Sequence, residues 1–514
     1  MNPRLERGLP WIVAAVVLGL GFFVVDTLPV GAMRDDGMYV ILAKSLATGH
    51  GYRWLHVPGA PPATHFPPGY PALLALLWLI VPSFPANVLV FKFVNAGFMA
   101  ITAAGMMIFL QRRCRLESPT AAAVAVAGAI GIPTLVLTTM VLSEPLFLAL
   151  LIPGLLLAER VGDGEDSYVW LAALGATAGA LTLVRSHGIA FVAAIALVLL
   201  MQRRFRDAAL CTGIALVVLL PWQLWVHAHE GTLPAAMQGN YESYFTWLAS
   251  GIETEGPVLL LRTVRRTATE MTAMFSTAVA FGMPPALRIV GLGGFALLLA
   301  VGFRRLWNAA PTTTIFLAMY TAMILVWPFP PARFVWGVWP LVFAVPALGA
   351  LALWKWRPTS LHERTVRVCA LAAGAFVAFG YARYTERGYQ GQWWSSIPRS
   401  GASTVRDLVI WTRSHTRPTD VVMTNDEPLV YLYADRASVP ATSFVVTDYF
   451  RPKSGIESQQ VLRSMLAAYH VDVVAIVASD SLASAARSLS ARQPPELVLR
   501  DRFANGIAFA PAPR

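Results

Sequence analysis

Residues 35–49 have the sequence DDGMYVILAKSLATG and begin shortly after the first long apolar segment of the chain. If that segment crosses a membrane, the adjacent carboxylates Asp35 and Asp36 lie just beyond the membrane surface. Apolar residues recur at positions 39, 42, 43 and 46, which is the spacing of one helix face. Gly49 and Gly51 then favour a helix end. We expect a short helix with the acidic pair in its first turn, where carboxylates stabilise the helix dipole.

The composition is that of a membrane protein with many spans. The chain has 514 residues, of which 56% are hydrophobic and 13% are charged. A single soluble core could not bury so many apolar residues, whereas a bundle of transmembrane helices requires them. The apolar segment that starts at Trp11 has no small-residue cleavage motif, so we interpret it as a retained span and not as a signal peptide.

About eleven segments are long and apolar enough to be transmembrane helices of roughly 17 to 25 residues. They lie near 10–30, 87–110, 119–141, 144–160, 168–185, 188–202, 207–227, 286–303, 311–328, 335–354 and 366–382. The apolar run 71–81 is shorter and is bounded by prolines. We therefore interpret it as a helix in the outer interface of the membrane.

The net charge of +11 reflects basic residues in the short loops between the apolar segments. These residues are Arg112, Arg113, Arg115, Arg203, Arg204, Arg206, Arg304, Arg305, Lys355, Arg357, Arg364 and Arg367. Such clusters favour the cytoplasmic side of a membrane, which places the N-terminus inside and the loops 31–86 and 228–285 outside. If the run 71–81 crossed the membrane, the later clusters would all lie outside. The charge therefore needs no nucleic-acid partner.

The second outer loop, 228–285, has two interpretations. It carries Tyr241, Tyr244 and Trp247 near its start and an amphipathic stretch with several arginines further on. Such a loop either covers a site or lies on lipid headgroups.

The character of the chain changes beyond residue 382, where apolar residues form short alternations such as 471–477. Helical stretches near 401–415 and 457–469 flank these candidate strands. We expect residues 1–382 to form the membrane domain and residues 383–514 to form a small extracytoplasmic α/β domain.

Few ionisable residues lie at the outer ends of the expected spans, where polar groups are costly unless they are paired or functional. They are Asp35, Asp36, His65, Glu144, Arg185, His187 and Arg333. This combination suits a reaction in which a carboxylate takes a proton from a hydroxyl group while arginines hold a departing phosphate. Structural alternatives exist for each: the aspartates and Glu144 as helix caps, Arg185 as a counter-charge, and the histidines and Arg333 as interface residues.

A divalent metal is allowed by the acidic pair but is not indicated. Hard cations require several converging oxygen ligands, and the sequence displays no such array. The three cysteines, Cys114, Cys211 and Cys369, lie beside the basic clusters and indicate neither a disulfide framework nor a cysteine metal site.

At these residues the chain resembles the membrane-embedded C-type (GT-C) glycosyltransferases that use polyprenyl-phosphate sugars. This group includes the protein O-mannosyltransferases and the aminoarabinose transferases of lipid A. The resemblance covers roughly residues 1–350. Its landmarks are Asp35-Asp36-x-x-Tyr39, His65-Phe66-Pro67-Pro68-Gly69-Tyr70-Pro71, Ser143-Glu144-Pro145-Leu146-Phe147, Leu183-Val184-Arg185 and Arg333-Phe334.

The resemblance implies a role for several of these residues. Asp35 would be the base that activates the acceptor. Asp36, which stands where the family often has a glutamate, is the second catalytic candidate and the alternative base. Together with the convergence of polar groups at the outer face, the resemblance leads us to expect that Tyr39, His65, Glu144, Arg185, His187 and Arg333 bind substrate. Some members hold the donor phosphate with a lysine or arginine near the second juxtamembrane helix, where this chain has His65, so Arg185 or Arg333 would take that part.

We therefore expect a glycosyltransferase that moves a sugar from a polyprenyl-phosphate carrier to a glycan, lipid or protein acceptor, with inversion, at the outer face of a bacterial plasma membrane. Nucleotide sugars are confined to the cytoplasm, so a transferase on the outer face needs a donor that a lipid has carried across. One alternative is a lipid or solute transporter, although transporters usually place charges near the membrane midplane. Another is a catalytically inactive binding protein.

Overall fold

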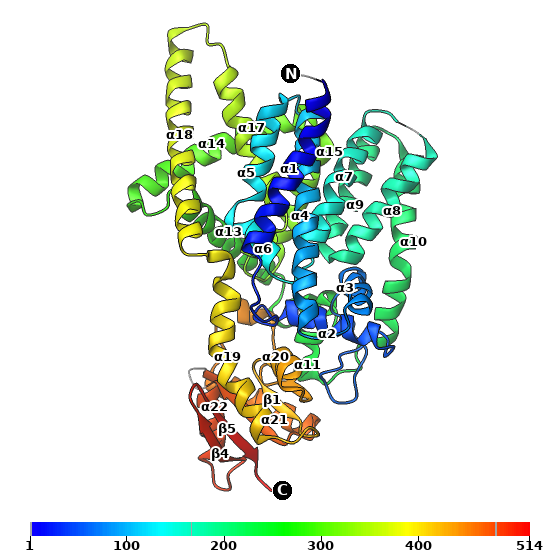
Figure 1. The fold of residues 1–514 in the computed structure, drawn as a ribbon, viewed down its shortest axis with the longest axis vertical. Helices are drawn as coiled ribbons and strands as arrows, with labels where there is room; N and C mark the ends of the chain where they lie inside the picture. Colours follow the sequence, from blue (N-terminus) through cyan, green and yellow to red (C-terminus); the bar gives the residue numbers. More distant parts are fainter. Residues whose placement is uncertain (1–2, 166, 478–480, 514) are drawn as a thin grey trace.

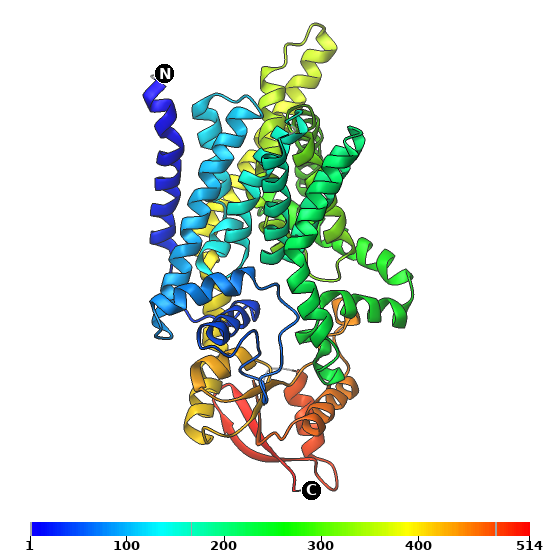
Figure 2. The same cartoon turned by 90° about the vertical axis from the view of Figure 1, so that its right-hand side faces the viewer.

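The computed structural model describes residues 3–165, 167–477 and 481–513 of the chain. Figure 1 shows a bundle of helices with a small α/β domain at one end and the N-terminus at the other. Figure 2 shows two short helices, α2 (Asp35–Ala47) and α3 (Gly69–Ile80), between the bundle and the α/β domain. The predicted mainly helical fold with a C-terminal α/β domain is confirmed.

Every predicted span contains a helix. Among the described residues, five helices are long and apolar enough to cross a membrane: α4 (Ala86–Arg112), α7 (Glu144–Gly162), α10 (Phe205–His229), α14 (Pro285–Ala309) and α18 (Leu361–Gln390). Further apolar helices occupy most of the other predicted spans: α1 (Pro3–Val24), α8 (Tyr168–Val184), α9 (Ile189–Met201), α15 (Pro311–Val326) and α17 (Trp339–Lys355). The number of crossings stays a prediction.

The segment 119–141 is not the single straight helix that its composition predicts. It divides into α5 (Ser118–Ala129) and α6 (Ile132–Thr139), which are bent by 59° at the break. Gly131 caps α6, and Pro133 lies in its first turn, where the missing N–H of proline favours a helix start. The first helix begins and ends earlier than the predicted span near 10–30, because it extends from Pro3 to Val24.

The loops with basic clusters meet at one end of the bundle. Arg113, after α4, donates to Asp163 after α7 at 3.1 Å and to the carbonyl oxygen of Ala309 at the end of α14 at 3.3 Å. Arg204, before α10, donates to the carbonyl oxygen of Glu165 at 3.0 Å. Figure 1 shows this end beside the N-terminus and away from the α/β domain. The grouping agrees with the predicted topology, and the orientation in a membrane stays a prediction.

The first outer loop forms the predicted pair of short helices. Helices α2 and α3 pack on each other, with the rings of Tyr39 and Tyr70 at 5.2 Å and edge to face. The expected single apolar stripe on α2 is too narrow, because Met38, Val40 and Ile41 are buried as well. Helix α20 (Glu427–Leu429) of the α/β domain packs against α2.

The second outer loop is mostly helical and includes α11 (Ala235–Tyr241), α12 (Tyr244–Glu255) and α13 (Val258–Val279). Trp247 of α12 donates to the carbonyl oxygen of Phe444 at 3.1 Å, which fixes this loop to the α/β domain. The loop therefore does more than lie on lipid headgroups.

The α/β domain has a five-stranded sheet in the order β2-β1-β3-β5-β4. Strand β1 is parallel to β2 and β3, whereas β5 is antiparallel to β3 and β4. The strands are β1 (Val422–Thr424), β2 (Ser438–Pro440), β3 (Val473–Val477), β4 (Leu497–Phe503) and β5 (Gly506–Pro511). The helices are η2 (Trp393–Ser395), α19 (Ser396–His415), α20 (Glu427–Leu429), η3 (Val430–Ala434), η4 (Val446–Tyr449), α21 (Gly455–Ala468) and α22 (Ser481–Ser490).

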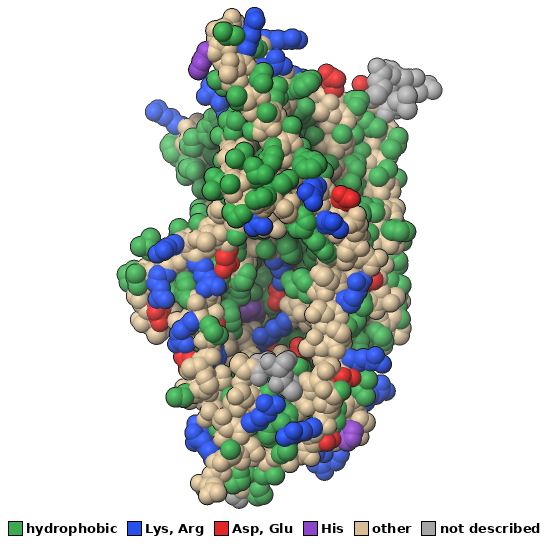
Figure 3. Space-filling model, turned by 90° about the vertical axis from the view of Figure 1, so that its left-hand side faces the viewer, with side chains coloured by type: hydrophobic (Ala, Val, Ile, Leu, Met, Phe, Trp, Pro, Cys, Tyr) green, Lys and Arg blue, Asp and Glu red, His purple; other side chains and the backbone are tan. Residues whose placement is uncertain are grey.

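One hydrophobic cluster joins the outer helices to this domain. It includes Val40 and Leu42 of α2 together with Met423, Val439 and Leu462 of the α/β domain. The outer loops and the α/β domain are therefore packed as one body below the helical bundle. Figure 3 shows a largely apolar surface over the helices and a hollow next to the α/β domain in which charged and histidine side chains are visible.

Candidate active site

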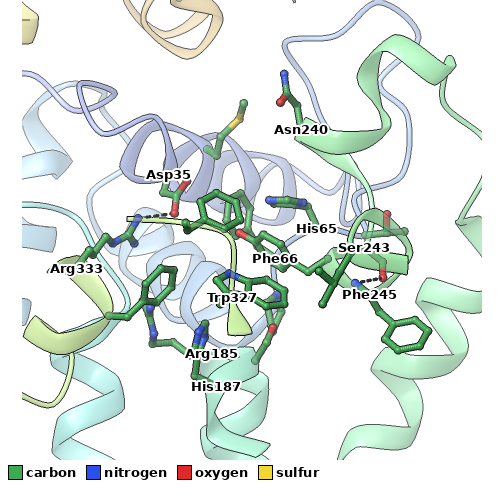
Figure 4. A pocket seen from close by; sticks show the side chains of 18 of the residues that line it. Asp35, His65, Phe66, Arg185, His187, Asn240, Ser243, Phe245, Trp327 and Arg333 are labelled. Atoms are coloured by element: carbon green, nitrogen blue, oxygen red, sulfur yellow. Dashed lines mark hydrogen bonds and ion pairs between the residues drawn. The ribbon is translucent and has the colours of Figure 1, made fainter. Parts of the chain in front are cut away.

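A cavity of about 680 Å³ lies where the outer loops meet the ends of the helices. Its wall includes Asp35 of α2, His65 of the first loop, Tyr244 of α12 and Arg333 of the short helix α16 (Ala332–Trp336). Figure 4 shows Arg333 pointing toward Asp35, with Arg185 on the side of the membrane helices and Asn240 on the other side. Side chains from the whole length of the membrane domain therefore meet here.

A chain of ion pairs forms one side of the cavity. Arg333 donates through Nη1 to Oδ2 of Asp35 at 2.5 Å and through Nε to Oε1 of Glu144 at 2.7 Å. Arg185 lies 2.7 Å from the same oxygen of Glu144. Two arginines and two carboxylates thus alternate, and their formal charges cancel. Glu144 is fully buried, which requires such pairing.

The two adjacent aspartates have different environments. Asp35 lines the cavity, and its side chain is 27% exposed. Asp36 points away into the protein, where its carboxylate accepts from the backbone N–H groups of Gly31 at 2.9 Å and Met33 at 3.1 Å. Burial raises the pKa of Asp36 to about 6, although the hydrogen bonds from these N–H groups favour the charged carboxylate and lower the pKa. Neither aspartate is the N-cap of α2. Arg34 occupies the N-cap position, and its side chain makes no capping hydrogen bond.

Tyr39 and Arg185 meet through a serine at the start of α7. Arg185 donates to Oγ of Ser143 at 3.0 Å, and the hydroxyl of Tyr39 lies 3.3 Å from the same atom. Burial raises the pKa of Tyr39 to about 12, so its hydroxyl keeps its proton and can donate. Tyr39 and Arg185 both line the cavity, whereas Glu144 lies behind the wall and braces it.

The two histidines line the cavity at different places. His65 has Nδ1 2.5 Å from the carbonyl oxygen of Glu242, and burial lowers its pKa to about 4, so the ring is neutral at pH 7 and its Nδ1–H donates. His187, in the single turn η1 (Ser186–Gly188), stacks on Phe334 with the ring centroids 4.8 Å apart. His65 therefore cannot replace a lysine as the positive charge for a phosphate.

Comparisons with known proteins agree on the fold. No family model and no curated protein matches the chain. ArnT from Cupriavidus metallidurans in the apo state aligns over 99% of this chain and 99% of its own, with a TM-score of 0.57 and 13% identity. The same protein bound to undecaprenyl phosphate aligns over 98% and 99%, with a TM-score of 0.52 and 14% identity.

An archaeal protein is also similar. The oligosaccharyltransferase AglB from Archaeoglobus fulgidus, solved with an inhibitory peptide and a dolichol-phosphate, aligns over 91% of this chain and 69% of its own, with a TM-score of 0.50 and 12% identity. The chain has the GT-C fold. The predicted resemblance is confirmed at the level of fold, and it extends past residue 350, because the alignment with ArnT includes the α/β domain.

The sequence did not reveal one charged pair beside the site. Arg34 lines the cavity and forms an ion pair with Glu427 of α20, a residue of the α/β domain. The signal available was weak: Arg34 precedes the acidic pair, and Glu427 stands before a proline at a helix start, as Glu144 does. Nothing in the sequence says that residues 34 and 427 meet.

Among the described residues, no group of three or more His, Cys, Asp or Glu side chains could hold a metal ion. Asp35 is bound by a guanidinium, and Asp36 by backbone N–H groups. A metal requirement stays untested by this arrangement.

Proposed function

We propose that this protein is a membrane glycosyltransferase that transfers a sugar from a polyprenyl-phosphate carrier to an acceptor hydroxyl. The observation that carries the proposal is the pairing of Asp35 with Arg333 on the wall of one cavity, at 2.5 Å. The GT-C fold supports the same reaction class. Transfer assays with labelled donors and candidate glycan, lipid or protein acceptors identify the sugar and the acceptor.

Asp35 is the proposed general base. Of the two aspartates it alone lines the cavity, and its partial exposure lets an acceptor hydroxyl reach it. Asp36 keeps both carboxylate oxygens on backbone N–H groups, so we assign it the role of shaping the turn. A base must lie within hydrogen-bond reach of the proton it removes, and Asp35 meets this condition for a group inside the cavity.

Arg333 and Arg185 are the proposed partners of the donor phosphate. Both line the cavity, and guanidinium groups suit phosphate because they donate two parallel N–H bonds. A phosphate that binds Arg333 competes with Asp35 for the guanidinium. Donor binding would thereby free the carboxylate to accept the proton of the acceptor.

The reaction balances without any further reactant. Asp35 takes the hydroxyl proton as the acceptor oxygen forms a bond to the anomeric carbon. The bond from that carbon to the phosphate oxygen breaks, and its electron pair stays on the phosphate, which the arginines hold. A direct displacement of this kind inverts the anomeric centre.

A lipid can reach the cavity from the helical bundle. Ile189 at the start of α9 is 43% exposed and Phe245 of α12 is 81% exposed, and both line the cavity. Exposed apolar side chains beside a cavity that also holds charged groups suit an acyl or prenyl chain with a charged headgroup. ArnT was solved with undecaprenyl phosphate and AglB with a dolichol-phosphate, which supports a polyprenyl phosphate here.

The proposed location is a bacterial plasma membrane, with the N-terminus in the cytoplasm and the α/β domain outside. The basic loops at the end opposite the cavity support this orientation. A transporter remains the competing hypothesis, but the paired charges lie at one end of the helices and do not follow a path through the bundle.

The experiment uses purified protein in lipid nanodiscs with labelled polyprenyl-phosphate sugars and candidate acceptors. We expect transfer by the wild type and a loss of at least about 100-fold in kcat for Asp35→Asn. The control is Asp163→Asn, which removes an aspartate paired with Arg113 at the opposite end of the bundle. Full transfer by Asp35→Asn would reject the assigned base. Flux of substrate through liposomes without transfer would favour the transporter, and donor binding alone would favour an inactive binding protein.

A further inference from the structure

The segment 30–37, which carries Asp35, packs against the α/β domain. An added Cβ at Gly31 would lie 2.8 Å from Cγ of Leu429, and one at Gly37 would lie 2.8 Å from Cβ of Pro428. The backbone N–H of Val30 donates to the hydroxyl of Tyr433 at 3.0 Å. Helix α20 and the turn after it therefore touch the segment at both ends, and glycine is needed for this approach.

Between these contacts lies the ion pair of Arg34 and Glu427. Glu427 is buried, with 2% of its side chain exposed, whereas the side chain of Arg34 is 34% exposed and lines the cavity. The same oxygen of Glu427 accepts from the hydroxyl of Tyr241 at 2.8 Å. The guanidinium carbon of Arg34 also lies 5.4 Å from the centroid of the Tyr241 ring. Two distant parts of the chain thus fix one arginine.

The backbone at Arg34 needs this restraint. Its φ is 62°, which is a sparsely populated conformation for a residue with a side chain. The residue that follows is Asp35, so the backbone conformation at position 34 decides the direction in which the carboxylate leaves the helix. Strained backbone persists where surrounding contacts determine it, and here some of those contacts, from Glu427 and Tyr433, come from another domain.

We infer that Glu427 of the α/β domain is a positioning residue for the transfer reaction: through Arg34 it holds the turn that aims Asp35 into the cavity. This inference rests on the proposed function. Glu427 does not line the cavity, so it acts through Arg34 and not on substrate. The α/β domain then forms part of the catalytic unit, in addition to any role in acceptor binding.

The test compares Glu427→Gln with the wild type in nanodiscs. Glutamine keeps the shape and an acceptor for Tyr241 but removes the charge that holds Arg34. We expect kcat to fall about 10- to 100-fold with KM for the lipid donor unchanged, because misplacing a base slows the chemical step and not donor binding. We also expect faster hydrogen exchange in the peptide that covers residues 30–37.

The control is Glu496→Gln, which removes a surface partner of Arg463 in the same domain and should change neither readout. Arg34→Lys is the second variant, because it leaves the buried Glu427 with a cation, and it should lower kcat in the same way. Adding Glu427→Gln to Arg34→Lys should then lower kcat little further, since both act through one contact.

Unchanged kcat or unchanged exchange in Glu427→Gln would overturn the inference, as would equal losses in Glu496→Gln. The inference would also be overturned if the losses in kcat caused by Glu427→Gln and Arg34→Lys added up fully in the double variant. If the wild type transfers no sugar, the proposed function fails by itself, and the exchange measurement still decides whether Glu427 holds the turn.

Discussion

Arg333 donates to Asp35 through Nη1 at 2.5 Å and so holds the proposed base in place. Its Nε donates to Glu144 at 2.7 Å. One guanidinium therefore connects a carboxylate exposed in the cavity with a carboxylate buried behind it. Because the guanidinium is planar and rigid, it sets the direction of Asp35 relative to the start of α7.

Arg333→Lys tests whether this geometry matters beyond charge. Lysine is a point charge and cannot serve both carboxylates and a phosphate in fixed directions. We expect kcat/KM for the lipid donor to fall by about 100-fold, measured as initial transfer rates in nanodiscs. The control is Arg113→Lys, at the opposite end of the bundle, which should stay within about twofold of the wild type. Equal activity of the two variants would show that charge alone suffices.

Glu144→Gln should destabilise the protein. Glu144 is fully buried between two arginines, and removing its charge leaves both without their shared partner. Breaking a buried ion pair typically costs about 3 to 5 kcal/mol. We expect a clearly lower midpoint of thermal unfolding in detergent. Glu165→Gln, which breaks a surface pair with Arg160, should leave the midpoint nearly unchanged. An unshifted midpoint for Glu144→Gln would contradict this account.

Asp36 should make stability depend on pH. Burial raises its pKa from 3.8 to about 6, so the folded state binds more protons than the unfolded state between these values. The contribution of this residue to stability is then fully present below about pH 4 and is lost as the pH rises through about 6. We expect the midpoint of the wild type minus that of Asp36→Asn to be larger at pH 5 than at pH 7.5. A difference that does not vary with pH would contradict the assignment.

The fold could be predicted from the sequence wherever one local signal dominates. Apolar segments of sufficient length predicted the positions of the apolar helices, and the acidic turn followed by a helical repeat predicted α2. The bend between α5 and α6 was missed, because the two apolar helices give one continuous hydrophobic signal and only Gly131 and Pro133 mark the break.

The candidate site was predicted in part, because sparse charges at the ends of spans stand out from an apolar background. That Asp35 and Arg333 meet agrees with this reasoning. The different orientations of Asp35 and Asp36 could not be read from the sequence, because they depend on the backbone conformation at Arg34. The pairing of Arg34 with Glu427 depends on how two domains pack, and no local pattern encodes that contact.

The last prediction concerns His65, which is neutral and not cationic in this site. Its Nδ1 lies 2.5 Å from the carbonyl oxygen of Glu242, and burial lowers its pKa to about 4. The side-chain amide of asparagine can take the place of Nδ1–H, whereas that of glutamine reaches toward the position of Nε2. We expect His65→Asn to keep most of the transfer rate and His65→Gln to lose about tenfold, the effect of one hydrogen bond worth roughly 1.4 kcal/mol.

The pH profile separates this role from that of a phosphate-binding cation. A neutral His65 does not titrate between pH 5.5 and 8, so kcat/KM should follow the same profile in the wild type and in His65→Asn. If His65 bound the donor phosphate as a cation, the wild type would gain affinity for the lipid donor below pH 6.5 and the variant would not. Such a gain would overturn the neutral assignment and return part of the phosphate site from Arg185 and Arg333 to His65.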